Sequence, residues 1–453
     1  MAEPPHKPSY EELEKENGRL RAELERLKEL VEELRRAQHR PHAPFSKGPP
    51  KPHPKKPGRK RGAAYGPKAH RLPPKHIDEV YDAPLPSRCD CGGKLVTDRV
   101  VPQYQVEIPR KPITRQFNTA FGHCENCNCE VHGRHSLQTN HAVGAAASQL
   151  GPDAQSLAVH LNKEAGLSHG KIARFFQAAF GITLSRGGSA QIMLRAAQRC
   201  TPVYLNILVL VRNSSWVVAD ETGWKVGGLL QWLHVFVTEW ATLYIIQPSR
   251  GSDVPEAALG ADYSGHMIHD GWKTYDRFIN ASHTQCNRHL INRCDHLIEQ
   301  ALGTSATFPR QVKALLLEGL ALRDARDAGT LSHALAERKV RCVQDRLQAL
   351  CNPKTNLGND RLARFLDRRI GEVFNYIRHP GTDATNWRGE QAIRPAVVNR
   401  KVWGGSRTDN GAQAEGILKS TLRTAAQLGH DTINFLARTL RAPLGCEPQL
   451  IPK

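Results

Sequence analysis

The chain has 453 residues and a formal net charge of +19, a size that predicts several domains with a buried core. Its longest strongly apolar run, Ile207 to Val211, is far shorter than the ~20 residues of a membrane-spanning helix, and the N-terminus has no apolar signal core, so a membrane or secreted protein is excluded. The charge indicates a polyanionic partner, nucleic acid first, because Lys and Arg displace condensed counterions. Eleven cysteines, some in close pairs, suit metal ligation and free thiols better than disulfides.

Residues 1–37 are predicted to form a leucine-zipper coiled coil. From Tyr10 the apolar positions recur at spacings of three and four, and one seam position is Leu throughout while the other carries Asn17. This pattern favours a parallel homodimer, or a larger oligomer, whose buried Asn sets the register. The alternative is a single solvated helix rich in Glu and Arg. The seam leucines are Leu13, Leu20, Leu27 and Leu34.

Residues 38–76 are predicted to be a disordered, basic, Pro-rich linker. They contain eleven Lys or Arg and no acidic residue, a composition that cannot bury a core. Within them Arg59, Lys60 and Arg61 are candidate DNA-binding residues. They could enter a minor groove, or the linker could act only as a flexible tether that raises the local affinity for DNA.

Residues 77–141 are predicted to be a zinc-ribbon-like β module. Two cysteine pairs with turn-prone neighbours flank a strand-rich stretch, an arrangement in which four thiolates close a tetrahedral site around structural Zn²⁺. Cys129 competes for the fourth position, and free thiols in a small β module are the alternative. The predicted ligands are Cys89, Cys91, Cys124 and Cys127.

Residues 150–205 are predicted to be helical, with the length and capping of a helix-turn-helix. One helix opens at Leu167 and Ser168, a turn follows Gly181, and a second helix begins at Ser189. The second helix would offer Gln191 and Arg195 to DNA; a helical brace packed on the next domain explains the same pattern.

Residues 212–295 contain the pattern that carries chemistry. The order of predicted elements, three strands, one helix and a fourth strand, matches the ribonuclease-H-like fold, with Asp220 at the end of the first strand and Asp270 after the fourth. Carboxylates on separate strands can hold the two hard cations, ~4 Å apart, that phosphodiester chemistry needs. The predicted strands are 215–219, 230–238, 241–247 and 266–269, with the helix at 254–259.

The layout resembles the bacterial DDE transposases of insertion sequence family sixty-six. The segments that carry the resemblance are Ala219-Asp220-Glu221-Thr222, His269-Asp270-Gly271-Trp272 and Asn386 to Pro395, followed by Arg400-Lys401 and Gly404-Gly405-Ser406. The resemblance implies that Asp220, Asp270 and Glu390 are catalytic acids that bind two Mg²⁺ (or Mn²⁺) ions. It also implies double-stranded DNA (element ends and target) as substrate, companion proteins of the same element, and the cytoplasm and nucleoid of a bacterial cell as location.

Several residues near the acids have open assignments. Glu390 lies four residues before Arg394, so an ordinary surface ion pair is the alternative to catalysis, in which case Asp383 or Glu372 would be the third acid. His266 and His269 are weak candidates for phosphate contact.

Two neighbours of the acids are expected to lie apart from the metals or beside the DNA. Glu221 should point to the opposite strand face from Asp220. Cys286 and His289 fit a buried Cys with a hydrogen-bonded His, or, by the resemblance, a pair that orients the scissile strand.

The gap of 120 positions between Asp270 and Glu390 predicts an all-helical insertion at residues 296–380. It could clamp transposon ends or the partner subunit, or brace the helix that carries Glu390. Residues 381–441 should complete the core with a C-terminal helix that packs on it. Arg394, Arg400 and Lys401 there are candidate DNA-binding residues.

The predicted fold class is thus multidomain: an α+β ribonuclease-H-like catalytic core with a helical insertion, preceded by a coiled coil, a zinc-ribbon-like module and a helix-turn-helix-like segment. The predicted function is a transposase that cleaves transposon ends and joins 3′-hydroxyl ends to target DNA. The alternatives are a non-enzymatic zinc-ribbon and zipper regulator that binds DNA, and a ribonuclease-H-like nuclease that cuts without joining.

Overall fold

The computed structural model describes residues 9–38, 74–86, 88, 90–106, 108, 111–139, 150–352, 354, 356–443 and 445–450. They belong to two units, one made of residues 1–40 and 115–453 and the other of residues 41–114. The described part of the second unit consists of turns and extended backbone. No helix among the described residues combines the length and apolarity needed to cross a bilayer. Arg59, Lys60 and Arg61, predicted to bind DNA, lie outside the described residues.

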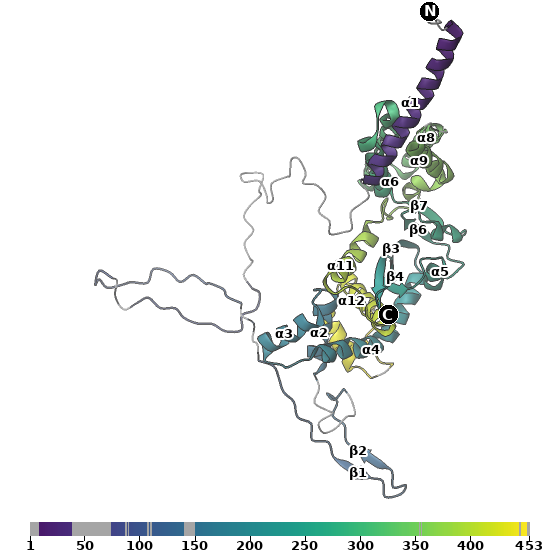
Figure 1. Cartoon of the computed structure of the whole chain (residues 1–453). Helices are drawn as coiled ribbons and strands as arrows, with labels where there is room; N and C mark the ends of the chain where they lie inside the picture. The colour runs from purple at the N-terminus through teal and green to yellow at the C-terminus, as the bar shows by residue number, and fades with distance from the viewer. Residues whose placement is uncertain are drawn as a thin grey trace, which may run out of the picture. The chain divides into compact units, whose positions relative to one another are not determined.

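The N-terminal element is the 29-residue helix α1 (Tyr10–Gln38; Figure 1). Ser9 and Glu12 form a reciprocal cap at its start: the Ser9 amide donates to Glu12 Oε2 at 2.8 Å and the Glu12 amide to Ser9 Oγ at 3.3 Å. Leu13, Leu20 and Leu27 each stay about half exposed. The helix is as predicted, and its dimerisation stays a prediction that would bury these leucines.

The cysteine-bearing hairpin pairs β1 (Phe121–His123) with β2 (Glu130–His132) in antiparallel register. In its turn the Cys124 amide donates to Cys129 O at 2.9 Å, and hydrogen bonds from Cys129 and Cys124 lower the pKa of the Cys127 thiol. A turn that favours thiolate suits metal ligation. Cys89 lies outside the described residues and Cys91 belongs to the other unit, so the four-cysteine zinc site stays a prediction.

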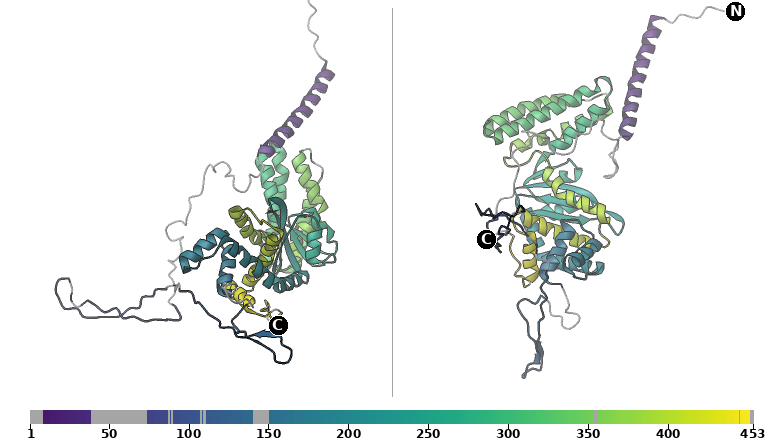
Figure 2. Two further views of the ribbon diagram at one scale, coloured as in Figure 1. Left: turned by 60° about the horizontal axis from the view of Figure 1, so that its bottom comes forward. Right: turned by 90° about the vertical axis from the view of Figure 1, so that its left-hand side faces the viewer.

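A five-stranded mixed sheet forms the centre of the fold (Figure 2). Its order is β5-β4-β3-β6-β7; β3 pairs antiparallel with β4 and parallel with β6. β7 pairs parallel with β6 and was not predicted, because four residues of mixed polarity give no clear alternation. The strands are β3 (Trp216–Val226), β4 (Leu229–Val237), β5 (Thr242–Gln247), β6 (His266–His269) and β7 (Ser282–Gln285).

The two faces of the sheet bury different helices because alternate strand residues point to opposite sides. Val217 and Ala219 pack with α4, α5 and the C-terminal helices, whereas Val218 packs with Ala392 and Ala396 of α11. The sequence thus places Asp220 on the α11 face. The helices are α4 (Arg186–Arg212), α5 (Asp253–Leu259), α11 (Trp387–Trp403), α12 (Asp409–Gln427) and α13 (Thr432–Arg441).

Helix α12 covers the free edge of β5. Ser420 Oγ accepts from the Tyr244 amide at 2.8 Å, and Thr424 Oγ1 accepts from the Thr242 amide at 3.0 Å. One turn before Ser420, Gly416 lets the helix approach so closely that an added Cβ would lie 2.9 Å from Tyr244 O. Hydroxyls at helical spacing therefore satisfy an edge that would otherwise attract another strand. The C-terminal helices pack on the core, as predicted.

The predicted helix-turn-helix is two helices, α3 (His169–Phe180) and α4, preceded by α2 (Pro152–Lys163). Ser185 caps α4 by accepting from the Gly188 amide at 2.9 Å, so α4 starts at Arg186 and not at Ser189. It also runs past the predicted boundary at 205, because Ile207 and Val211 are buried against the sheet.

This helical segment shares its core with the C-terminal helices. Ile172 and Phe176 of α3 pack in one cluster with Leu418 and Leu422 of α12. That packing is the arrangement of a brace, while Gln191 and Arg195 remain exposed on α4. DNA binding by those two residues stays a prediction.

The segment before α11 is helical, and its long helices share a core of their own. Its end is bound to the sheet: the Asn375 side chain donates to Ser282 Oγ at 2.7 Å and to His283 O at 2.9 Å, both on β7. The helices are α6 (Asn287–Gln300), α7 (Thr307–Asp327), α8 (His333–Leu350), α9 (Leu357–Arg368) and α10 (Ile370–Val373).

The close contact between α12 and β5 predicts how a methyl group added at Gly416 changes the stability of the fold. Gly416→Ala should lower the free energy of unfolding by about 1–3 kcal/mol, since the added Cβ displaces backbone. In an open helix the same change stabilises by up to about 1 kcal/mol. The control is Gly187→Ala in α4, whose nearest neighbour would be Ser185 Oγ at 3.9 Å. Chemical denaturation measures both, and equal effects would contradict the close approach.

Candidate active site

Asp220 lies in the middle strand of the sheet. Its side chain, like that of Val218, faces α11, and an added Cβ on Gly389 of α11 would lie 3.1 Å from Asp220 Cβ. Asp220 Oδ1 accepts from the Glu221 amide at 2.9 Å. Glycine at position 389 therefore allows the helix to lie directly against the first acid.

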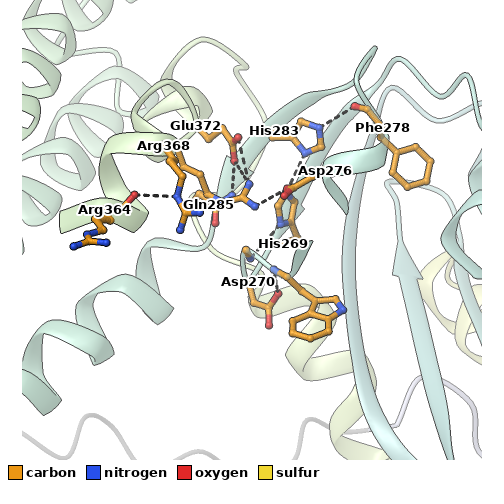
Figure 3. Close-up of polar contacts among 12 residues, drawn as sticks. His269, Asp270, Asp276, Phe278, His283, Gln285, Arg364, Arg368 and Glu372 are labelled. Carbon is orange, nitrogen blue, oxygen red and sulfur yellow. Dashed lines mark hydrogen bonds and ion pairs between the residues drawn. The ribbon is translucent and has the colours of Figure 1, made fainter. Parts of the chain in front are cut away.

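Asp270 follows β6, the strand that runs parallel to β3. Its Oδ1 accepts from the Trp272 amide at 2.9 Å, so the carboxylate caps the turn that starts there. Gly271 has φ of +91°, and an added Cβ would lie 2.5 Å from Gln285 Oε1 and 2.8 Å from Phe365 Cζ. Only glycine fits this turn, which presents Asp270 beside the sheet (Figure 3).

Glu390 lies in the first turn of α11, with its side chain about half exposed. The start of this helix is fixed from the other side of the site: Cys286 Sγ donates to Asn386 Oδ1 and accepts from the Asn386 amide, both at 3.3 Å. The Asn287 amide also donates to Ala384 O at 2.9 Å. The helix that follows β7 therefore positions the third acid.

The three carboxylates influence one another. Burial raises the pKa of Asp220 to about 8, and the negative charges of Glu221, Asp270 and Glu390 add to the shift. The structure thus brings all three predicted acids into one electrostatic neighbourhood. Their negative charges act on Asp220 together, which is the condition that a bound cation would relieve.

A family model described as Transposase IS66 family matches residues 147–414, more than half of the chain. The chain belongs to the IS66 transposase family. A comparison with curated proteins gave no match. The matched residues include Asp220, Asp270 and Glu390, together with the helical segment between the second and third acids.

Two histidines of the transposase beside Asp270 do not contact phosphate, contrary to the weak expectation from the sequence. His269 is fully buried; one ring nitrogen lies 3.0 Å from His283 Nδ1 and the other accepts from the Gly271 amide at 3.1 Å. Burial keeps the pKa of His269 well below its ordinary value, so the ring stays neutral and can accept. It therefore supports the Asp270 turn.

His266 is the second of these histidines and is also buried. It stacks on His379 with ring centroids 4.1 Å apart, and its ring nitrogens lie near Ser282 Oγ and Thr284 Oγ1. Burial lowers the pKa of His266 to about 3. Its contacts join the end of the helical segment to β6 and β7, where no phosphate can reach.

Cys286 is buried, and burial raises the pKa of its thiol. Three atoms that could bind a metal lie within 4.8 Å of one another: Cys286 Sγ, a ring nitrogen of His289 and a carboxylate oxygen of Glu390. Because the Cys286 sulfur already bonds both to the amide and to the side chain of Asn386, it serves to position α11. His289 Nε2 lies 3.8 Å from Glu390 Oε1, which is within ion-pair distance.

Glu221 points away from the acids, as predicted. Its buried carboxylate accepts from Arg250 at 2.8 Å and from the Tyr275 hydroxyl at 2.9 Å. The Arg250 guanidinium lies between the rings of Trp232 and Trp272, 4.4 and 4.0 Å from their centroids. This network supports the other face of β3 and the start of the turn after Asp270.

The predicted basic cluster after Glu390 divides into two kinds of residue. Arg394 is exposed on α11 and free to meet DNA in solution. Arg400 donates to Gly223 O and lies 3.5 Å from Thr222 Oγ1, so it ties the end of α11 to β3. Lys401 is partly buried. DNA contact by these residues stays a prediction, and for Arg400 a structural role is visible.

Sequence reasoning missed the residues that hold the acids in place. Asn386, Gly389 and Gly271 lie next to the recognised acids in the chain, but their contacts are to Cys286, Asp220 and Gln285, which are distant in sequence. A glycine directly before or after a candidate acid is the signal that could have pointed to two of them.

The raised pKa of Asp220 predicts a pH-dependent stability. Between its ordinary value of 3.8 and about 8, the folded chain holds this proton more tightly than the unfolded chain, so stability is lost as pH rises through that window. Asp220→Asn should therefore raise the melting temperature at pH 8 without metal and leave it unchanged below pH ~4. Thermal unfolding across this range measures the difference, and a pH-independent difference would contradict it.

The Asp270 turn predicts the outcome of a matched pair of glycine substitutions. Gly271→Ala should abolish most DNA cleavage because the clash with Gln285 and Phe365 displaces Asp270. Gly260→Ala shares the left-handed backbone, with φ of +89°, but has open space around it. It should cost about 1–2 kcal/mol of stability and keep activity. Equal activities of the two variants would show that the turn does not position the acid.

Proposed function

We propose that the chain cleaves the ends of a DNA element and joins the freed 3′-hydroxyl ends to target DNA. The observation that carries this proposal is the placement of the three residues: Asp220 lies on a central strand, Asp270 follows its parallel neighbour, and Glu390 lies on the helix whose Gly389 packs against Asp220. The charges of Asp270 and Glu390 add to the raised pKa of Asp220. Membership of the IS66 transposase family supports the reaction class.

The residues fit divalent magnesium, with manganese as the substitute. Carboxylate oxygens are the hard ligands that Mg²⁺ prefers, and burial, together with the negative charges of Glu221, Asp270 and Glu390, raises the pKa of Asp220. Two bound ions would supply activation of the attacking hydroxyl and stabilisation of the leaving oxygen. Asp220, Asp270 and Glu390 would hold them.

The surrounding residues act by fixing these carboxylates. His269 accepts from the Gly271 amide and keeps the Asp270 turn in shape. Cys286 and Asn386 fix the first turn of α11, while Gly389 permits contact with Asp220. Preorganised ligands of this kind need little rearrangement when a metal and a phosphate arrive.

We assign the core to the ribonuclease-H-like fold. Three consecutive antiparallel strands followed by two parallel ones support the assignment, as does the position of the acids on β3, after β6 and on a helix behind the sheet. In this division the insertion comprises residues 296–380, between core parts at 212–295 and 381–441. Its end at Asn375 and His379 braces β7.

Other parts of the chain support roles in oligomer assembly and in DNA binding. The half-exposed leucines of α1 support a homodimer or larger coiled coil, and the Cys124 turn supports structural zinc in the module at 77–141. The +19 charge supports binding of double-stranded DNA through the linker at 38–76 and Arg394. Companion proteins of the same element would complete the machinery.

The proposal predicts the behaviour of three acid variants. Asp220→Asn, Asp270→Asn and Glu390→Gln should each lower Mg²⁺-dependent cleavage of end-containing DNA by roughly a thousandfold, since each loses several kcal/mol of transition-state stabilisation. Asp262→Asn, an exposed acid in a loop after α5, is the control and should keep full activity. A gel assay for cleavage and strand joining measures all four.

The same assay separates the alternatives. Full activity of the acid variants would overturn the assignment of the site. Binding of DNA without cleavage by the unmutated chain in Mg²⁺ would indicate a regulator, and cleavage without joining would indicate a nuclease.

A further inference from the structure

A cavity of about 470 Å³ opens beside the turn that carries Asp270. One wall is the turn itself, with Gly271 and Lys273, and the opposite wall is the end of α9, with Phe365 and Arg368. Figure 3 shows Asp270 and Arg368 on either side of Gln285. The cavity therefore borders both the turn after Asp270 and the helical insertion.

The Lys and Arg side chains that line this cavity differ in whether they form ion pairs with acids. Arg369 donates to Asp276 at 2.5 Å and to Glu372 at 3.1 Å, so its charge is neutralised. Lys273 and Arg368 are exposed, and within the described residues neither has an acidic partner at ion-pair distance. The Arg368 Nε instead donates to the Arg364 carbonyl at 3.2 Å (Figure 3). Two cations thus face the cavity with their charge available.

Helix α9 continues this positive surface away from the cavity. Arg361, Arg364 and Arg368 follow one another at spacings of three and four, so they share one face, and all three are exposed. The opposite face, with Leu362 and Leu366, is buried in the core of the insertion. Over these seven residues the helix rises about 10 Å, the length of roughly three nucleotides of one strand.

Only one acid accompanies these arginines on the exposed surface in an ion pair. Arg364 Nη2 lies 2.7 Å from Asp360 Oδ2, but the Arg364 side chain is 74% exposed and Asp360 Oδ1 also accepts from the Lys354 amide at 3.2 Å. A helix face that carries charges of both signs and contacts only solvent would need no adjoining cavity. Here Lys273 and Arg368 line such a cavity, and Gly271, the residue after Asp270, lines it as well.

We propose that Lys273 and the Arg361, Arg364 and Arg368 face of α9 form a track for the sugar-phosphate backbone of one DNA strand. A phosphate next to the scissile position would lie between Lys273 and Arg368, with its sugar against Ile279 and Phe365. The inference rests on the proposed DNA phosphoryl transfer and gives the helical insertion a clamping role in addition to its contact with β7.

The test measures the affinity of the full-length chain for a short mixed-sequence duplex, because backbone contacts do not depend on sequence. Fluorescence anisotropy at several salt concentrations gives the number of phosphates neutralised. Calcium replaces magnesium so that no strand is cut. Lys273→Gln/Arg368→Gln should flatten the slope of log K against log[salt] by about 1.8 and weaken binding at 0.15 M salt about 30-fold.

Two matched control variants are needed to interpret the change in salt dependence. Arg338→Gln/Arg341→Gln removes the same charge from the exposed face of α8 and should keep most of the slope. Lys273→Arg/Arg368→Lys keeps the charge and should restore it. Thermal unfolding verifies that each variant is folded.

The outcomes separate the track from the active site. If the Gln pair at positions 273 and 368 keeps the slope of the α8 control, while the unmutated chain binds and cuts DNA, the track is wrong and the proposed function stands. If the unmutated chain binds the duplex but does not cut end-containing DNA in magnesium, the proposed function fails while the track is still measured. A chain that binds no DNA overturns both.

Discussion

The site depends on the close approach of one helix to one strand. Helix α11 can lie against β3 because residue 389 is glycine, and Glu390 follows this glycine in the first turn of the helix. The approach is directional as well as close, because Cys286 and Asn386 fix where the helix begins. The first turn of α11, which carries Glu390, is thus held on two sides, although this helix and the strands are joined through a long helical segment.

The helical segment between the second and third acids is what makes this approach possible. It has its own hydrophobic core, and its end is bound to β6 and β7 through Asn375 and His379. After this long segment the chain therefore returns to a defined position beside β7 before α11 begins. The same segment carries the basic face of α9, whose Arg368 lines the cavity beside the turn after Asp270. Bracing the third acid and holding a DNA strand are compatible tasks, since different faces of the segment perform them.

The distant edge of the sheet is held by polar contacts of a different kind. Ser420 and Thr424 satisfy the backbone of β5. Nearby, Glu415 is buried between Lys163 and Lys419. Burial opposes its ionisation, yet the two ammonium groups keep the pKa of Glu415 below its ordinary value. Removing one partner of such a group leaves an unpaired buried charge, which typically costs 3–5 kcal/mol. This cluster joins α2 to α12 and so ties the brace to the core.

The sequence by itself predicts most of the helices and strands, though not β7, and makes Asp220 and Asp270 candidate acids. Alternation of apolar residues defined β3 to β5, and Asp220 and Asp270 followed because strand ends are marked by local composition. Spacings of three and four predicted α1, and the helices before α11 were likewise read from their periodicity. These features depend on neighbours in the chain, and that is why they could be read from it.

Only the tertiary structure decided which side chains meet. Glu390 follows from the resemblance, and the approach of its helix to Asp220 depends on a contact between residues 220 and 389. His266 and His269 were read as phosphate contacts because they flank an acid, but the packing of β7 and His379 buries them. Arg400 was read as a DNA contact, whereas its partner is the backbone of Gly223. Burial and partnership arise from segments far apart in the chain, and residue type and spacing do not encode them.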